Sequence, residues 1–289
     1  MRQTNLPDGT ALPVLGLGTW RLGEDASKRQ EEIRTLHAAI GMGYRLIDTA
    51  EMYGEGGAEQ VVGQAVADAI HAGDVDREAL YVVSKVYPHN ASRRGTVAAC
   101  ERSLKRIALD YIDLYLLHWR GNHPLNETVA AMQSLVAAGN IRHWGVSNFD
   151  VDDLQELAAV LRQGDASAPG CDTNQVYYSL SERGPEFGLL PWMRERQMPL
   201  MAYSPIDQGV LAADAALAAI AGPRGLTAAQ VALAWITSQP GVLAIPKAGT
   251  LRHLQQNLAA SAIELDAAER QAIEARFPRP QRKTPLAMI

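Results

Sequence analysis

Four polar residues end or closely follow short apolar runs in the first half of the chain: Asp48, Tyr53, Lys85 and His118. A β-strand that is buried along its length reads as a continuous Val/Ile/Leu run, as the strands of parallel sheets do. A charged group at the end of such a strand is costly unless the strand end opens onto a site. Successive strands that end in this way predict one polar cluster at one end of a parallel sheet, and we expect the chemistry there.

The residue types in this cluster suit acid–base chemistry on a carbonyl group. A free tyrosine has a pKa of about 10, which a nearby ammonium lowers by stabilising the phenolate. A carboxylate beside that ammonium keeps the lysine charged, so we expect Asp48, Lys85 and Tyr53 to form a relay with Tyr53 as general acid. His118 can donate a hydrogen bond to a substrate oxygen. Together they suit a carbonyl that becomes an alkoxide, where negative charge builds and a proton must arrive.

Each of these residues also has an ordinary structural explanation. Asp48 could cap a helix, Tyr53 and Lys85 could lie on loop surfaces, and His118 could be a core histidine. A Schiff base at Lys85 is an alternative chemistry. Metal ligation is disfavoured, because the group holds one histidine and no motif with ligand spacing.

The elements that would position this cluster alternate between strand and helix along the chain. The expected strands cover residues 14–19, 45–48, 80–85, 112–118, 141–147, 172–175, 200–203 and 242–247. Six of the seven intervals between their ends are 28 to 37 residues long, which matches one βα unit each. This pattern predicts a (β/α)8 TIM barrel that occupies residues 1–289 as a single domain. An open doubly wound sheet is the alternative, but no strand here is followed by GxGxxG.

Three further features refine this fold. Asp8 and Gly9 predict an N-terminal β-hairpin, which we expect to plug the barrel bottom, and residues 204–226 predict a long loop. Ser27 with Gln30 predicts a capping box at the start of a helix that Gly41 and Gly43 end. Thr227 with Gln230 predicts a second capping box.

Composition restricts the compartment and the partners. The formal net charge of −5 and the pI near 5.8 argue against a nucleic-acid binder. We expect no membrane partner and no targeting segment, because the N-terminal residues lack an apolar stretch and the segment 211–221 is too short to cross a bilayer. Two cysteines and no CxxC motif fit a reducing cytoplasm, and the lack of an extended apolar surface stripe favours a monomer.

The later strand ends are polar as well. Ser147, Asn148 and Gln175 could hydrogen-bond a flat carboxamide, and Tyr203 could stack on an aromatic ring. Lys247, with Arg252 five residues on, places positive charge at the opening of the last helix, which favours phosphate, although a solvated lysine is an equally ordinary reading.

Taken together, these motifs resemble the aldo-keto reductase family. The resemblance rests, in order along the chain, on GLGTW at 16–20, IDTAEMYG at 47–54, VSK at 83–85, LLHW at 116–119, GVSNF at 145–149, NQV at 174–176, AYSP at 202–205 and IPKA at 245–248. Within the family, DTAEMYGEGGAE is most similar to bacterial members of the methylglyoxal-reductase type.

The resemblance implies a (β/α)8 barrel that binds NADP(H) without a Rossmann fold and reduces aldehydes or ketones to alcohols. It implies that Tyr53 donates the proton, that Lys85 and Asp48 tune it, and that His118 orients the carbonyl. The implied cofactor residues are Thr19, Trp20, Asp48, Ser147, Asn148, Gln175, Tyr203, Ser204, Pro205, Ile206, Lys247, Arg252, His253, Gln256 and Asn257. Trp20, Tyr53, His118 and Trp119 would line the pocket for a small carbonyl substrate, with 2-oxoaldehydes such as methylglyoxal among the candidates.

The chain departs from the family pattern at the adenosine end. Ala248 stands where the family often has serine, His253 where it often has arginine, and Gln256 where glutamate is usual. NADPH is therefore the expected cofactor, but these positions bear on its preference over NADH. A barrel that binds the cofactor without turnover, and a Schiff-base aldolase at Lys85, are the competing functions.

Overall fold

The computed structural model describes residues 1–165 and 167–289. Eight parallel strands form one sheet whose order follows the chain without reversal. They are β3 (Leu17–Gly18), β4 (Leu46–Asp48), β5 (Tyr81–Val86), β6 (Ile112–Leu117), β7 (Ile141–Ser147), β8 (Asn174–Tyr177), β9 (Leu200–Tyr203) and β10 (Val242–Ala244). A doubly wound sheet would reverse its order at a switch point. The fold is therefore the predicted (β/α)8 class, and the N-terminal hairpin of β1 (Gln3–Asn5) and β2 (Ala11–Pro13) is also confirmed.

Helices alternate with these strands. They are α1 (Arg29–Gly41), α2 (Gly57–Ala72), α3 (Arg93–Ile107), α4 (Leu125–Ala137), α5 (Val151–Gln163), α6 (Leu189–Arg194), α7 (Ala215–Ala221), α8 (Ala228–Thr237), α9 (Leu251–Ala260) and α10 (Ala267–Arg276). Short 3₁₀ turns add η1 (Tyr53–Gly56), η2 (Arg77–Ala79), η3 (Pro88–Asn90), η4 (Gly184–Glu186), η5 (Asp207–Ala213) and η6 (Gly222–Arg224).

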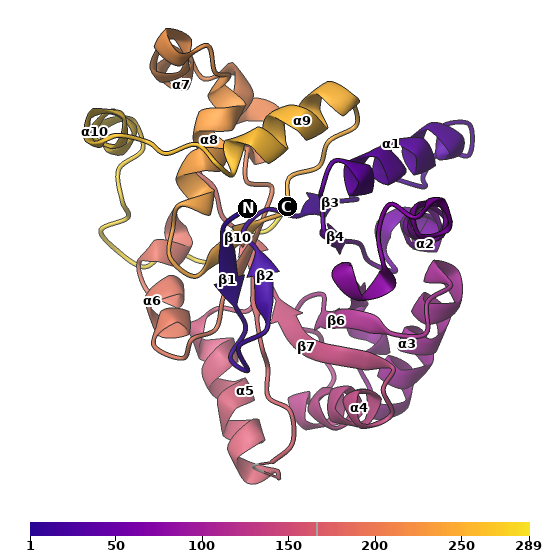
Figure 1. Ribbon diagram of the computed structural model, residues 1–289. Coiled ribbons are helices and arrows are strands. Elements are labelled where there is room, and N and C mark those ends of the chain that lie inside the picture. The colour runs from indigo at the N-terminus through magenta and orange to yellow at the C-terminus, as the bar shows by residue number, and fades with distance from the viewer. Residues whose placement is uncertain (166) are drawn as a thin grey trace. The chain divides into compact units, whose positions relative to one another are not determined.

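The residues pack as two compact units, Gly18–Asn174 and Met1–Leu17 with Gln175–Ile289. In the first unit, β4 to β7 pair in parallel, with Asp48 opposite Val83 and Lys85 opposite Leu116. Helices α1 to α4 lie outside these strands (Figure 1). Strands covered in this way are buried on both faces, and all six residues of β6 are buried. The single-domain organisation of residues 1–289 stays a prediction.

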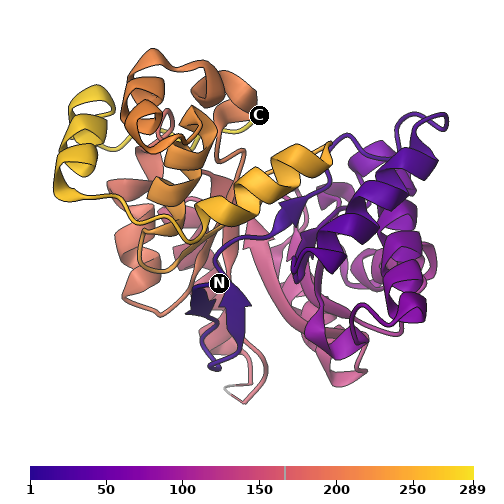
Figure 2. The ribbon, with the colours of Figure 1, turned by 45° about the horizontal axis from the view of Figure 1, so that its top comes forward.

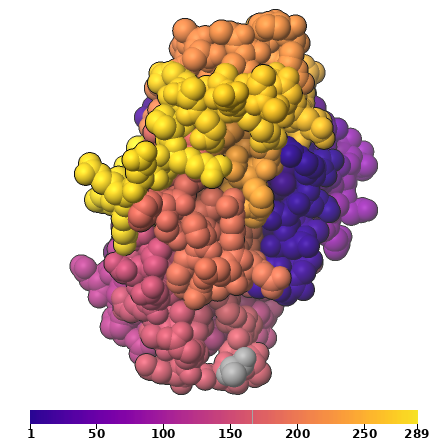
Figure 3. Space-filling model, turned by 90° about the vertical axis from the view of Figure 1, so that its left-hand side faces the viewer, coloured from indigo at the N-terminus to yellow at the C-terminus, as the bar shows by residue number. Residues whose placement is uncertain are grey.

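The second unit contains the hairpin, β8 to β10 and helices α6 to α10 (Figure 2). Strand β10 pairs in parallel with β9, and Leu15 forms a parallel bridge to Ala244. The C-terminal residues, yellow in Figure 3, lie over orange residues of the same unit. Arg183 ties them down, because its buried guanidinium bonds to Glu186, to Glu274 and to the carbonyl oxygen of Phe277. The hairpin's role as a barrel plug stays a prediction.

Several local predictions need correction. Ser27 does not cap α1; its hydroxyl donates to Asp25 at 2.6 Å instead, and the helix begins at Arg29. Residues 204–226 are not one long loop, because they contain α7, whose N-terminal amides bond to the Asp214 carboxylate. The last strand ends at Ala244 rather than 247, and β8 lies two residues later than expected. The N-cap position of α1 is occupied by Lys28, which forms no side-chain cap, because Ser27 and Asp25 bond to each other one turn earlier.

Two other local predictions are confirmed. Thr227 and Gln230 form the reciprocal capping box of α8. Gly43 follows α1 with a φ of 105°, a conformation that suits glycine and ends the helix. In the described ranges no single helix is both long and apolar enough to cross a membrane; residues 215–237 pass that test only as a pair of helices bent by 91°.

Candidate active site

Three of the four predicted catalytic residues meet around the ammonium of Lys85. This group lies 2.8 Å from the Asp48 carboxylate, 2.9 Å from the carbonyl oxygen of Thr49 and 3.2 Å from the Tyr53 hydroxyl. Lys85 is fully buried and Asp48 is 2% exposed. Strand β4 ends at Asp48, Lys85 comes one residue before the end of β5, and Tyr53 opens the 3₁₀ turn after β4. The predicted convergence at the strand ends is therefore present in the structure.

The electrostatics of this group differ from the expectation in one respect. Burial raises the pKa of Tyr53 well above 10, and the negative charge of Asp48 adds to this rise. Burial lowers the pKa of Lys85, while the carboxylates of Asp48 and Glu59 oppose that fall. The expected lowering of the Tyr53 pKa is thus wrong for this structure, because burial of the phenol and the negative charge of Asp48 both disfavour the phenolate. Tyr53 is therefore protonated at neutral pH.

His118 is the fourth predicted residue and directly follows β6. Its ring lies edge-on to Tyr53, with 5.7 Å between centroids, and 4.9 Å from the ring of Trp119. Burial holds the pKa of His118 well below 6.5, and the nearby Lys85 ammonium lowers it further. Within the described ranges, the buried Nδ1 has no hydrogen-bond partner. The imidazole is neutral and can offer one N–H to a ligand.

A second buried carboxylate lies behind this site and was not predicted. Glu59 of α2 is fully buried and accepts a hydrogen bond of 2.6 Å from Ser84, the residue before Lys85. It also bonds to Arg106 of α3. Side chains alternate along a strand, so Ser84 faces the helices while Lys85 faces the site. A glutamate on an apolar helix face is the signal that could have identified Glu59.

Tyr87 is a second residue that the sequence reasoning missed. Its ring meets Trp119 edge-on at 6.1 Å and lies 4.6 Å from His89. Its backbone amide donates to Glu51 at 2.7 Å, and its hydroxyl donates to Glu55 at 3.0 Å. The place of Tyr87, two residues after Lys85 and on the same side of the chain, was the available signal.

The remaining predicted residues of the Gly18–Asn174 unit are Thr19, Trp20, Ser147 and Asn148. Thr19 is buried and donates to the carbonyl oxygen of Asp48 at 2.9 Å. Asn148 has a φ of 59°, and its amide donates to the carbonyl oxygen of His118 at 3.1 Å and to Ser147 at 3.2 Å. Trp20 is partly exposed, with the guanidinium of Arg21 at 4.6 Å from its ring.

The other unit carries the remaining predicted residues on β8, after β9 and around α9. The Gln175 side chain is buried, and Tyr203 stacks on Tyr177 with 5.8 Å between the ring centroids. The next residues, Ser204, Pro205 and Ile206, form the turn after β9, in which Ser204 has a φ of 47°.

The expected phosphate-binding residues lie around the first turn of α9. Lys247, Arg252 and His253 are exposed, and Thr250 caps the helix by accepting from the amide of His253 at 3.2 Å. Gln256 and Asn257 follow one turn later, and Asn257 is buried. A helix N-terminus flanked by cationic side chains is a favourable environment for an anion.

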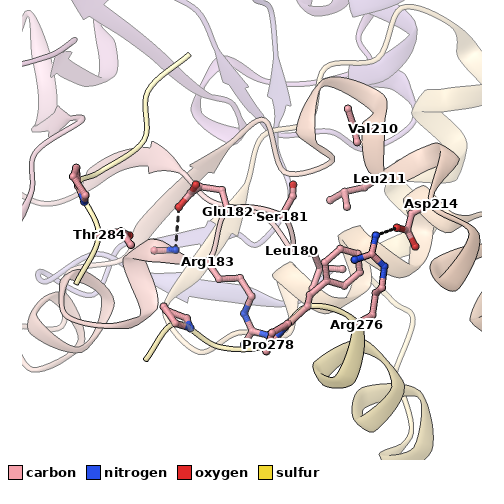
Figure 4. A pocket seen from close by; sticks show the side chains of 14 residues that line it. Leu180, Ser181, Glu182, Arg183, Val210, Leu211, Asp214, Arg276, Pro278 and Thr284 are labelled. Atoms are coloured by element: carbon pink, nitrogen blue, oxygen red, sulfur yellow. Dashed lines mark hydrogen bonds and ion pairs between the residues drawn. The ribbon is translucent and has the colours of Figure 1, made fainter. Parts of the chain in front are cut away.

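The unit that contains Gln175–Ile289 also has a cavity of about 540 Å³, and none of the predicted site residues lines it. It is lined by residues from 180–184, 210–214 and 276–285. In Figure 4, Arg276 extends toward Asp214, with 2.9 Å between nitrogen and oxygen. The ion pair belongs to the lining of the cavity and joins α10 to the cap of α7.

Comparisons with known proteins identify the family of this chain. The model of the Aldo/keto reductase family matches residues 14–276. The chain is 49% identical over 287 residues to methylglyoxal reductase YeaE of Escherichia coli, with 96% of each chain covered. It is 36% identical to a glyoxal reductase of Bacillus subtilis, with 84% of this chain and 80% of the relative covered.

Solved structures show the same fold. A crystal structure of an aldo/keto reductase from Klebsiella pneumoniae in complex with NADP and acetate superposes with a TM-score of 0.91, at 45% identity over 99% of both chains. The family model covers most of the chain, and the matches at high identity extend over nearly all of it. This chain belongs to the aldo/keto reductase family of oxidoreductases.

Proposed function

We propose that the protein reduces small aldehydes and ketones to alcohols with NADPH, with Tyr53 as the general acid. The observation that carries this proposal is the buried ammonium of Lys85, which lies 2.8 Å from Asp48 and 3.2 Å from the Tyr53 hydroxyl. A buried lysine held between a carboxylate and a phenol suits a proton transfer that leaves a phenolate behind.

The protonation states support this direction of transfer. Tyr53 is protonated at neutral pH, because burial raises its pKa, so it begins as a donor. When NADPH is bound, it would supply the hydride. As negative charge builds on the carbonyl oxygen, Tyr53 gives up its proton, and the ammonium of Lys85 stabilises the phenolate. The neutral imidazole of His118 orients the carbonyl through an N–H donor, because burial keeps its pKa well below 6.5.

The donors present fit a nicotinamide dinucleotide. Ser147, Asn148 and Gln175 are amide and hydroxyl groups of the kind that a carboxamide pairs with. Tyr203 offers an aromatic ring, and residues 204–206 provide the turn expected for the pyrophosphate. The first turn of α9, with Lys247, Arg252 and His253, would hold the 2′-phosphate, and Gln256 with Asn257 the adenosine.

The substrates we propose are small carbonyl compounds, including 2-oxoaldehydes such as methylglyoxal. The relatives named as methylglyoxal and glyoxal reductases support this class. So does the aromatic surface next to His118, to which Trp119 and Tyr87 contribute. Flat aromatic rings beside the reacting groups suit a small, planar carbonyl compound.

The test is NADPH oxidation at a fixed concentration of methylglyoxal, compared between the wild type and Tyr53→Phe. Loss of the positioned proton donor should reduce kcat by a factor of about 10² to 10⁴ while NADPH affinity stays near that of the wild type. Tyr178→Phe is a matched control, because its hydroxyl bonds to Glu186 in the other unit. Wild-type turnover in Tyr53→Phe would remove Tyr53 from the acid role.

The cofactor residues need a separate experiment. In Lys247→Ala, NADPH affinity should fall by more than NADH affinity, because only NADPH carries the 2′-phosphate. Equal weakening of both would place the phosphate elsewhere.

We further propose that the enzyme acts in the cytoplasm, since Cys100 and Cys171 are buried free thiols, as suits a reducing compartment. We also propose that the enzyme is a monomer. Sedimentation at micromolar concentration tests the monomer.

A further inference from the structure

The turn after β9 contains three residues in a backbone conformation that non-glycine residues rarely adopt. Ser204, Asp207 and Gln208 have φ values of 47°, 49° and 50°, and Gly209 follows with 101°. Residues with a Cβ atom disfavour this left-handed region, so such a segment keeps its shape only where other contacts hold it. Backbone bonds within the turn supply part of this support, with the amide of Asp207 donating to Ser204 at 2.8 Å.

The remaining support comes through the side chain of Asp207. One of its carboxylate oxygens accepts a hydrogen bond from the hydroxyl of Tyr177, and the other accepts from Ser181 at 2.8 Å. Both donors belong to the segment that starts at β8, and the whole arrangement lies within one compact unit. Two hydrogen bonds to a charged acceptor fix the position of Asp207 strongly.

Tyr177 also contacts the residue that precedes the turn. Its ring stacks on that of Tyr203, with 5.8 Å between centroids and an angle of 16° between the planes. Tyr177 is 7% exposed, so its ring is held in place by the protein around it. A single tyrosine thus supports the ring plane of Tyr203 through its face and the turn at 204–209 through its hydroxyl.

We propose that Tyr177 and Asp207 are positioning residues that hold Tyr203 and the 204–209 turn in the shape that binds the cofactor. This inference rests on the proposed function, in which Tyr203 and residues 204–206 contact NADPH. A turn that its own side chains already hold in shape spares the nucleotide the entropic cost of ordering it. Loss of the Tyr177–Asp207 bond releases the turn, weakens NADPH binding and speeds its dissociation.

Tyr177→Phe isolates the hydrogen bond, because it keeps the ring that stacks on Tyr203. Asp207→Ala removes both bonds to the turn. Tyr178→Phe is the matched control: it removes the hydroxyl of the next residue, which donates to Glu186 at 2.9 Å and does not contact the turn. None of these three residues belongs to the set around Lys85, so the proton-transfer group stays intact.

Two measurements are made on the full chain. The first is hydrogen exchange of the peptide that covers 204–211 in the protein without nucleotide; the second is the NADPH dissociation constant and off-rate from fluorescence. Tyr177→Phe and Asp207→Ala should speed exchange in this peptide, and should raise the dissociation constant by about tenfold or more, the loss expected for a hydrogen bond to a charged group. Tyr178→Phe should change neither.

The outcomes separate the two proposals. Wild-type protein that fails to bind NADPH would refute the proposed function. Unchanged exchange at 204–211 in both variants would overturn the positioning role of Tyr177 and Asp207. Faster exchange with an unchanged NADPH dissociation constant would also overturn it, because the turn would then be released without consequence for the cofactor.

Discussion

Replacement of Asp48 by asparagine isolates the charge that keeps Lys85 ionised. Asparagine matches aspartate in size and keeps an oxygen that can accept a hydrogen bond at the position 2.8 Å from the ammonium. The carbonyl oxygen of Thr49, at 2.9 Å, remains as a second acceptor. The change therefore removes one negative charge next to a fully buried positive one, with little change in shape.

The magnitude follows from the burial of both partners. Removal of one partner from a buried ion pair costs about 3 to 5 kcal/mol, because the remaining charge has no counter-ion in a poorly polarisable environment. Because Asp48 and Lys85 are 2% and 0% exposed, no discount for solvent screening applies. The two remaining acceptors place the expected loss for Asp48→Asn at the lower end, about 3 kcal/mol of unfolding free energy at pH 7.

The sign of the pH dependence follows from the pKa of Lys85. Burial lowers this pKa in the folded protein below the value of 10.5 for an exposed lysine, and loss of Asp48 lowers it further. Between the folded pKa and 10.5, the unfolded chain binds more protons, so stability rises with pH. The variant should thus recover part of its loss as the pH rises toward 10, because a neutral Lys85 needs no counter-ion.

Urea unfolding of the wild type, Asp48→Asn, Lys85→Met and the double variant, at pH 7 and at pH 9.5, tests this reasoning. The double variant should be more stable than Asp48→Asn, because it contains no unpaired buried charge. A loss under about 0.5 kcal/mol at pH 7, or an equal loss at both pH values, would refute the assignment of a charged, carboxylate-dependent Lys85.

Three further perturbations follow from the structure. Arg183→Met should lower the unfolding free energy in urea by about 3 kcal/mol, because Glu186 and Glu274 lose their buried partner. A change in unfolding free energy near zero would contradict a tethering role for Arg183. Gly63→Ala should lower the melting temperature, because an added Cβ would lie 2.2 Å from the carbonyl oxygen of Ile107. Gly41→Ala is the control: its Cβ meets no atom within 4 Å, so the melting temperature should stay unchanged. Equal effects of the two substitutions would argue against close packing of α2 on α3. His118 should remain neutral by NMR as the pH falls below 6.5, because burial lowers its pKa. The stability that it contributes is therefore lost as the pH falls from 6.5 toward the folded pKa, and His118→Gln should flatten this dependence. A titration of His118 near pH 6.5 would contradict this.

Much of the fold could be predicted from local pattern. Apolar runs with polar ends identified the strands, and their spacing in chain order identified the (β/α)8 class. The capping box of Thr227 and Gln230 was predictable because both partners lie within one turn. The same rule failed for Ser27, because its hydroxyl bonds to the neighbouring Asp25 instead. Local sequence signals predict a cap correctly where the two partners are adjacent and no neighbouring side chain competes for them.

The sequence by itself also determined which residues converge on Lys85, because strand ends in a parallel barrel meet at one end. Only the tertiary structure decided their protonation. The direction of the Tyr53 pKa depends on burial and on the balance of Asp48 against Lys85, which spacing does not encode. The tertiary structure also decided the hydrogen bonds of Glu59 with Ser84 and of Asp207 with Tyr177, because each joins residues at least 25 positions apart. Such pairs arise when packing brings separate elements together, and burial then determines the strength of their electrostatic interaction.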